Sequence, residues 1–186
     1  MLVGAGSSVP VAQSKTQSPT PPPVVTARDK ATIKNFTART DAFVKLRNRV
    51  RARLPKLSKD STAEQIAAHK NAFEDAMRAV RKGAKPGDII TTDTAEYIRR
   101  LIRTEFKGTE RGEVKKAILE AETGGVPLRV NYPYPEAMEF SEVPAKLLLE
   151  LPTLPKELNY RFAGRHMLLL DKENGLILDY MLNALP

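Results

Sequence analysis

The fold is decided by residues 160–182, which read YRFAGRHMLLLDKENGLILDYML. Three short runs of β-forming residues are separated there by two turn signals, Ala163-Gly164 and Glu173-Asn174-Gly175. Asn-Gly supplies the positive φ angles that a tight hairpin needs, and apolar residues flank it on both sides. Because a lone hairpin is barely stable in water, these strands need another layer to pack against. The sequence therefore predicts a small C-terminal antiparallel β-meander that lies on the helices upstream.

Helical periodicity dominates the part of the chain that precedes this sheet. We expect helices at residues 29–53, 62–82, 94–106 and 110–122, and a short one from Pro144 to Leu151. The first two carry apolar residues at three- and four-residue steps, which place them on one face of a helix. Those residues are Ile33, Phe36, Phe43, Leu46, Val50 and Leu54 in the first helix and Ile66, Phe73, Met77 and Val80 in the second. The predicted fold class is α+β, with an N-terminal bundle of about four helices followed by the sheet.

The chain of 186 residues has the size of one domain with a tail. Residues 1–27 are rich in Pro, Ser and Thr, which is typical of a disordered tail, and residues 28–186 form the predicted single domain. The first twelve residues are small and mildly apolar but lack a basic head, so they resemble only the end of a signal peptide. We therefore expect a periplasmic or secreted bacterial protein whose sequence starts inside or after an export signal. The alternative is a cytoplasmic protein with a disordered tail.

Several chemistries are poorly supported by the composition. Cysteine is absent, which excludes disulfides, thiolate metal sites and cysteine nucleophiles. His69 and His166 are far apart in the sequence and neither lies in a ligand-spaced motif, so we assign no metal site. The sequence has no Gly-x-Ser-x-Gly elbow and no phosphate-cradling loop, so we assign no catalytic residue and no cofactor. No stretch reaches the length of a transmembrane helix.

The formal charge of +8 is concentrated in one helix and its flanks. Residues 28–59 contain eleven Lys or Arg and two acids, whereas residues 60–186 contain slightly more acids than Lys and Arg. This distribution does not indicate a nucleic-acid footprint over the whole domain. Basic residues occupy every second position from 45 to 53. At 100° per residue, Lys45, Arg49 and Arg53 lie opposite the apolar stripe, and they are our candidate anion-binding residues.

Two interpretations of this basic helix stay open. Either it binds an anionic partner, such as nucleic acid, an anionic lipid surface or an acidic protein, or it is simply a solvated helix face. Residues 45–53 contain no aromatic side chain on which bases could stack, so nucleic acid is the weakest of these partners. The sequence alone favours the solvated face.

Arg47 points toward the apolar stripe, and a buried arginine needs a carboxylate or carbonyl partner. Asp171 and Asp179 in the C-terminal sheet are the candidate partners, and either pair would tie the first helix to the sheet. We also expect Asp171 to cap the turn and Asp179 to pair with Arg161 or Arg165. All five residues are therefore candidates for structural ion pairs. The alternative is a hydrolase-type enzyme in which Asp171 and Asp179 meet across the hairpin as an acid pair.

One stretch carries a resemblance to known proteins. Residues 151–165 read LPTLPKELNYRFAGR and are followed by Leu168–Asp171 and Leu176–Asp179. This string resembles the ending of a group of uncharacterised exported bacterial proteins, which also have a helical N-terminal part with a Pro-Gly-Asp turn, as at Pro86-Gly87-Asp88 here. The resemblance covers residues 30–186 and implies a signal peptide and a periplasmic or secreted setting, with no assigned activity. A looser likeness to periplasmic modules of nickel and cobalt homeostasis covers only the hairpin, and this chain lacks their His-rich content, so metal binding does not carry over.

These observations lead to three functional hypotheses. The leading one is a non-enzymatic exported protein that acts as a binding or envelope-associated module. The second is a binder of nucleic acid or of an anionic surface through the basic helix at residues 45–53. The third is the enzyme that uses Asp171 and Asp179.

Overall fold

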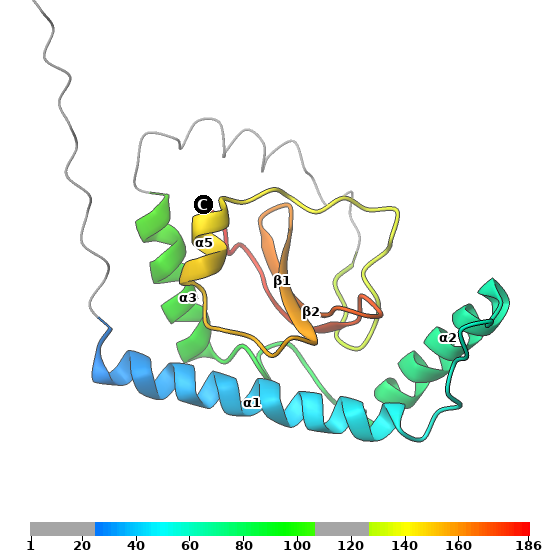
Figure 1. Cartoon of the computed structure of the whole chain (residues 1–186). Coiled ribbons are helices and arrows are strands. Elements are labelled where there is room, and N and C mark those ends of the chain that lie inside the picture. The colour runs from blue at the N-terminus through cyan, green and yellow to red at the C-terminus, as the bar shows by residue number, and fades with distance from the viewer. Residues whose placement is uncertain (1–24, 107–126) are drawn as a thin grey trace, which may run out of the picture.

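The computed structural model of the chain describes residues 25–106 and 127–186 (Figure 1). Within these residues, helices come first and a three-stranded antiparallel sheet ends the chain, so the fold is α+β as the sequence predicts. The helices are α1 Ala27–Arg51, α2 Ala63–Val80, α3 Thr92–Glu105 and α5 Ala145–Glu150, and the strands are β1 Leu158–Ala163, β2 His166–Asp171 and β3 Ile177–Met181. The helix predicted at residues 110–122 lies outside the described residues, as does the predicted tail up to residue 24.

The first two helices begin at reciprocal side-chain caps. Thr26 and Asp29 form a capping box at the start of α1, so this helix begins just inside the segment predicted as tail. Thr62 and Gln65 form the same arrangement at the start of α2. Gly83 follows α2 with a φ of 101°, a backbone conformation that residues with a Cβ atom rarely adopt. Local signals of this kind explain why the predicted helix bounds lie close to the observed ones.

The three strands lie side by side in chain order. A turn at Gly164 joins the first two strands, so Ala163 faces His166 across the hairpin. In the second hairpin Leu169 faces Asp179, and an irregularity after Leu169 shifts the remaining register. Since side chains alternate between the faces of a sheet, this register places Leu169 and Asp179 on the same face.

The sheet separates two apolar layers. One face joins the main core with α1 and α3, which lie below and beside the sheet in Figure 1. The other face is covered by the segment at residues 128–138, which contains several turns. The main core includes Phe36, Ile98, Met167, Leu169 and Met181, and the second layer includes Tyr134, Leu168, Leu170 and Ile177. The helix-facing side of the sheet is therefore where buried polar groups of the sheet can meet the helices.

The apolar stripe predicted on α2 is only half correct. Phe73 and Met77 are buried in the main core, but the exposed fractions of Ile66 and Val80 are 50% and 46%. Ile66 lies on the N-terminal half of α2, which projects away from the body of the molecule in Figure 1. Periodicity identifies the apolar side of a helix, but it does not show what length of the helix is covered by the elements that pack against it.

Candidate functional site

Arg47 connects α1 to the end of β2 through a buried ion pair. Its side chain is 3% exposed, and its Nε donates to a carboxylate oxygen of Asp171. The guanidinium also pairs with Glu173 and lies over the ring of Phe73, 5.6 Å from the ring centroid. Of the two partners predicted for Arg47, the structure therefore gives Asp171.

The carboxylate of Asp171 also caps the turn that follows β2. Its other oxygen accepts the backbone N–H groups of Glu173 at 3.0 Å and Asn174 at 3.2 Å. Burial lowers the pKa of Arg47, but the hydrogen bond and charge of Asp171, together with Glu173, raise it by more. The arginine therefore stays charged, and the pair fastens both the helix and the turn to one point of the sheet.

Asp179 binds a loop of the helical layer. Its side chain is 0% exposed, and its two oxygens accept the N–H groups of Gly87 at 2.9 Å, Ile89 at 2.8 Å and Ile90 at 2.7 Å. The N–H of Tyr180 adds a fourth bond of 2.8 Å. Burial raises the pKa of Asp179, and the four N–H groups oppose this rise. The carboxylate thus holds the Pro-Gly-Asp loop against β3.

The pairing predicted between Asp179 and Arg161 or Arg165 is not found among the described residues. Arg161 faces Leu168 across the hairpin, whereas Asp179 faces Leu169, so the two side chains lie on opposite faces of the sheet. Arg161 instead lies over the ring of Phe140, at 5.4 Å. Arg165 donates to the C-terminal segment, at the carbonyl oxygen of Leu185.

Asp171 and Asp179 share the helix-facing side of the sheet but serve different contacts. Asp171 accepts from Arg47 on α1, and Asp179 accepts from backbone groups in the loop at residues 87–90. In the described part of the chain, no three His, Asp or Glu side chains gather in a way that could hold a metal ion. Both acids are committed to holding the fold, so the geometry gives no support to the predicted acid pair.

Arg81 is a functional candidate that sequence reasoning missed. Its guanidinium donates to Asn131 Oδ1 at 2.6 Å and to the carbonyl oxygen of Leu178 at 3.1 Å, and it lies 5.1 Å from the ring centroid of Phe43. Burial lowers the pKa of Arg81, and the charge of Asp179 opposes this shift. The position of Arg81, four residues after the buried Met77, is the pattern that could have identified it.

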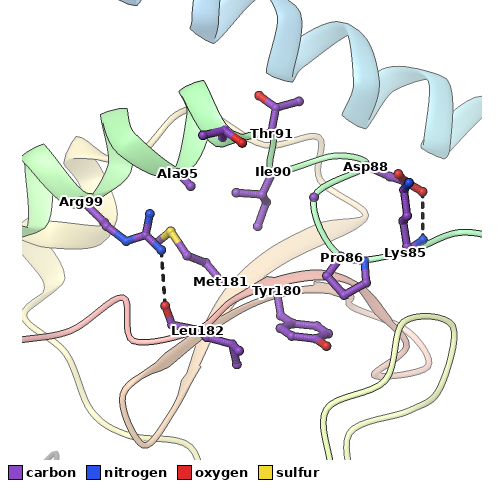
Figure 2. A pocket seen from close by; sticks show the side chains of 12 residues that line it. Lys85, Pro86, Asp88, Ile90, Thr91, Ala95, Arg99, Tyr180, Met181 and Leu182 are labelled. Carbon is purple, nitrogen blue, oxygen red and sulfur yellow. Dashed lines mark hydrogen bonds between the residues drawn. The ribbon is translucent and has the colours of Figure 1, made fainter.

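An open cavity of about 470 Å³ lies beside the loop that Asp179 holds (Figure 2). The loop at residues 85–88 forms one wall, the first turns of α3 form another, and the end of β3 forms the third. Lys85 and Arg99 contribute the basic side chains of this cavity, and Asp88 contributes an acid. Volumes of this order are typical of small-molecule sites.

The outer face of α1 carries five exposed basic side chains. They are Lys30, Lys34, Lys45, Arg49 and Arg53, the last in the turn that follows the helix, and we call this set the basic face. At 100° per residue they fall within less than half of the circumference of the helix. None of the five forms an ion pair with a carboxylate in residues 25–106 or 127–186. The three candidate anion-binding residues are thus exposed, and the described part of the chain offers them no ion pair.

His166 holds the C-terminal segment, and its protonation should weaken that contact. The Nδ1 atom accepts the N–H of Asn183 at 3.0 Å, which requires a neutral ring. Burial, and then the charge of Arg165, lower the pKa of His166. The folded protein therefore resists protonation more than the unfolded chain does, so this contribution to stability is complete above about pH 6.5 and is lost as the pH falls.

We expect the urea midpoint of the wild-type protein to drop between about pH 7.5 and pH 5.5, and to drop less for His166→Gln. His69→Gln is the matched control, because His69 is the other histidine of the chain and the same carboxylates titrate in all three proteins. An equal drop for wild type and His166→Gln would contradict the role assigned to this contact.

No protein-family model matches this sequence, and no curated protein or solved structure shows significant similarity to it. None of the described helices is long and apolar enough to cross a membrane.

Proposed function

We propose that the protein is a non-enzymatic binding module that attaches to an anionic lipid surface through the basic face of α1. The observation that carries this proposal is the alignment of five exposed cations that lack carboxylate partners within the described residues. Elsewhere on α1, Arg28 pairs with Asp93 and Arg51 pairs with Glu173. Arg39 donates to Asn35 and to the carbonyl oxygen of Asp88. Within the residues that the structure describes, the side chains of the basic face have no such ion pairs.

The shape of the basic face fits a flat lipid surface better than nucleic acid. A helix of 25 residues is about 37 Å long, so the charges form a line rather than a groove. The two aromatic residues of α1, Phe36 and Phe43, are buried, so bases would find no ring to stack on. Each Lys or Arg contributes about 1 kcal/mol near an anionic membrane, which for several residues amounts to measurable adsorption. Asp41 lies on the same side of the helix and reduces the net charge of the face by one.

Two further observations support the non-enzymatic and exported parts of the proposal. Asp171 and Asp179, the acids considered for hydrolysis, are both occupied by contacts that hold the sheet to the helices. The resemblance of residues 30–186 to exported bacterial proteins favours the bacterial envelope as the site of action. Expression with the native upstream reading frame in a bacterial host should place the protein in the periplasmic or secreted fraction, and its retention in the cytoplasm would refute export.

Co-sedimentation with lipid vesicles tests the binding. The wild-type chain should bind vesicles that contain about one third phosphatidylglycerol, fail to bind pure phosphatidylcholine, and dissociate as the salt rises to about 0.5 M. Replacing Lys45, Arg49 and Arg53 together with Gln should weaken binding at least tenfold, because about 3 kcal/mol of attraction is removed.

The control must remove the same charge from another place. Arg103, Lys156 and Lys172 are exposed and lie on elements other than α1, so their joint replacement with Gln gives a variant of identical net charge. This control variant should retain most of the vesicle affinity. Equal losses in the two variants would mean that net charge alone drives adsorption, and preferential binding to a short DNA duplex at the same salt would contradict the choice of a lipid partner.

A further inference from the structure

The cavity beside the Pro-Gly-Asp loop offers a second binding site that the basic face does not include. It lies where three segments distant in sequence meet, namely residues 85–92, the first turns of α3 and the end of β3 (Figure 2). Loops positioned by a rigid scaffold often carry binding sites, whereas the elements around them supply the core. A binding site here requires a rigid loop and a lining whose chemistry suits a ligand.

Hydrogen bonds from both layers of the fold hold the loop in place. The carboxylate of Asp179 accepts the N–H of Gly87 from the sheet side. From the helix side, Nη1 of Arg39 donates to the carbonyl oxygen of Asp88 at 2.7 Å. Within the loop, the N–H of Lys85 donates to the carboxylate of Asp88 at 2.9 Å, as Figure 2 shows. The wall of the cavity is therefore formed before any ligand arrives, which lowers the entropic cost of binding.

The charges of the cavity favour an anion. Lys85 and Arg99 lie at opposite ends of it, and neither forms an ion pair with a carboxylate of the described residues. The polar contact of the Arg99 guanidinium is a long one, 3.4 Å to the carbonyl oxygen of Leu182. Asp88 also borders the cavity, but its carboxylate accepts from the Lys85 backbone and its charge acts on Arg81. Two cations thus face one acid that is already engaged.

The remaining lining combines apolar surface with a hydroxyl group. Ile90, Ala95 and Met181 supply apolar contacts, and Thr92 supplies the hydroxyl. Thr92 also opens α3, whose N-terminus adds a favourable dipole for a negative group. We propose that this cavity binds a small molecule that carries a carboxylate or phosphate group on an apolar body. The anionic group pairs with Arg99, and the apolar body lies beside Ile90 and Met181.

Titration of the full-length, isotope-labelled protein by NMR tests the site with three probes of similar size. Phenylacetate and phenyl phosphate carry the two anionic groups, and 2-phenylethanol is the neutral control. Either anion should shift the amide signals of Gly87, Thr92 and Met181 in a saturable manner with a dissociation constant of about 1 mM, and the alcohol should bind at least fivefold more weakly. The stronger of the two anions identifies the preferred group.

Two variants on α3 that remove the same charge distinguish binding in this cavity from nonspecific attraction of the anion to the protein. Arg99→Gln should weaken binding of the better anion at least fivefold, whereas Arg103→Gln, one turn along α3 and outside the cavity, should leave the affinity unchanged. Both variants should bind anionic vesicles as the wild type does, so failure of this site is distinguishable from failure of the basic face. The proposal is overturned if shifts stay unsaturated to about 20 mM, if the alcohol binds equally well, or if the two variants lose affinity alike.

Discussion

Replacing Arg47 with Met should lower the free energy of unfolding by about 3 to 5 kcal/mol, because removing one partner of a buried ion pair leaves the other charge without compensation. Asp171 would keep its bonds to the turn at Glu173 and Asn174 but would lose the guanidinium of α1. The midpoint of urea unfolding, measured by far-ultraviolet circular dichroism, reports the loss directly.

Arg49 provides the control for this substitution. It lies two residues away on α1, is exposed, and has no ion pair with a carboxylate of the described residues, so Arg49→Met should change stability by less than about 0.5 kcal/mol. A buried ion pair can sometimes be replaced by apolar groups without loss. If Arg47→Met proved as stable as wild type, the ion pair would be dispensable and the attachment of α1 to the sheet would rest on apolar packing alone.

Replacing Asp179 with Asn should cost about 3 kcal/mol or more, since hydrogen bonds to a charged group each contribute roughly 1.5 to 3 kcal/mol. The amide keeps the shape of the side chain but offers one acceptor oxygen instead of two. Its NH₂ group would then face either the N–H groups of Gly87 and Tyr180 or those of Ile89 and Ile90. Buried donors without an acceptor destabilise the folded state, so the loop should detach from β3.

Two measurements separate this effect from a general loss of structure. Urea unfolding gives the overall cost, and hydrogen exchange at Gly87, Ile89 and Ile90 should speed up well beyond that of the helix interiors. Asp60→Asn, an exposed substitution in the loop before α2, should leave both quantities unchanged. Unaltered exchange at the three loop amides in Asp179→Asn would mean that another contact holds the loop, and the cavity beside it would lose its preformed wall.

The contacts that the sequence predicted are those in which both partners carry a local signal. The turn at Gly175 and the capping residues of the helices are encoded within a few positions, so the strands and most helix bounds could be predicted. The tight Asn-Gly hairpin was not correct, because the connection spans residues 172–176 and only Gly175 of the pair has a positive φ, 67°. Arg47 was placed near the core because 100° steps along a helix decide its direction before any tertiary contact is known. An arginine that faces the apolar stripe needs a carboxylate partner, and the predicted sheet contains only a few carboxylates that could serve.

The contacts that the sequence did not reveal depend on register or on the backbone. Arg161 and Asp179 lie on opposite faces only because of the pairing across β2, and the length of the second turn did not fix that pairing in advance. The partners of Asp179 are N–H groups of the Pro-Gly-Asp loop. Because nearly every residue type carries a backbone N–H, the sequence does not show which of them will donate. The cavity forms only where Asp179 holds the Pro-Gly-Asp loop against β3, so no local sequence pattern could predict it.

The two sides of α1 make different contacts. Its inner side supplies core residues and the guanidinium of Arg47, which binds the sheet, whereas the side chains of the basic face form no ion pair within the described residues. The rigid attachment of α1 to the sheet would keep those charges in line when the protein meets a surface. The proposed lipid attachment therefore depends on the same helix that organises the fold.

The claim that the basic face of α1 binds the membrane is tested most directly by fluorescence quenching. The measurement shows which side of the protein approaches the headgroups of a bound vesicle. The chain has no cysteine, so a single fluorescent label can be attached at Ala38→Cys on the outer side of α1 or at Ala72→Cys on the exposed side of α2. With anionic vesicles that carry a quencher in the headgroup region, the label at position 38 should be quenched and the label at position 72 should not. Equal quenching at both positions, or stronger quenching at position 72, would contradict the assignment of the basic face as the binding surface.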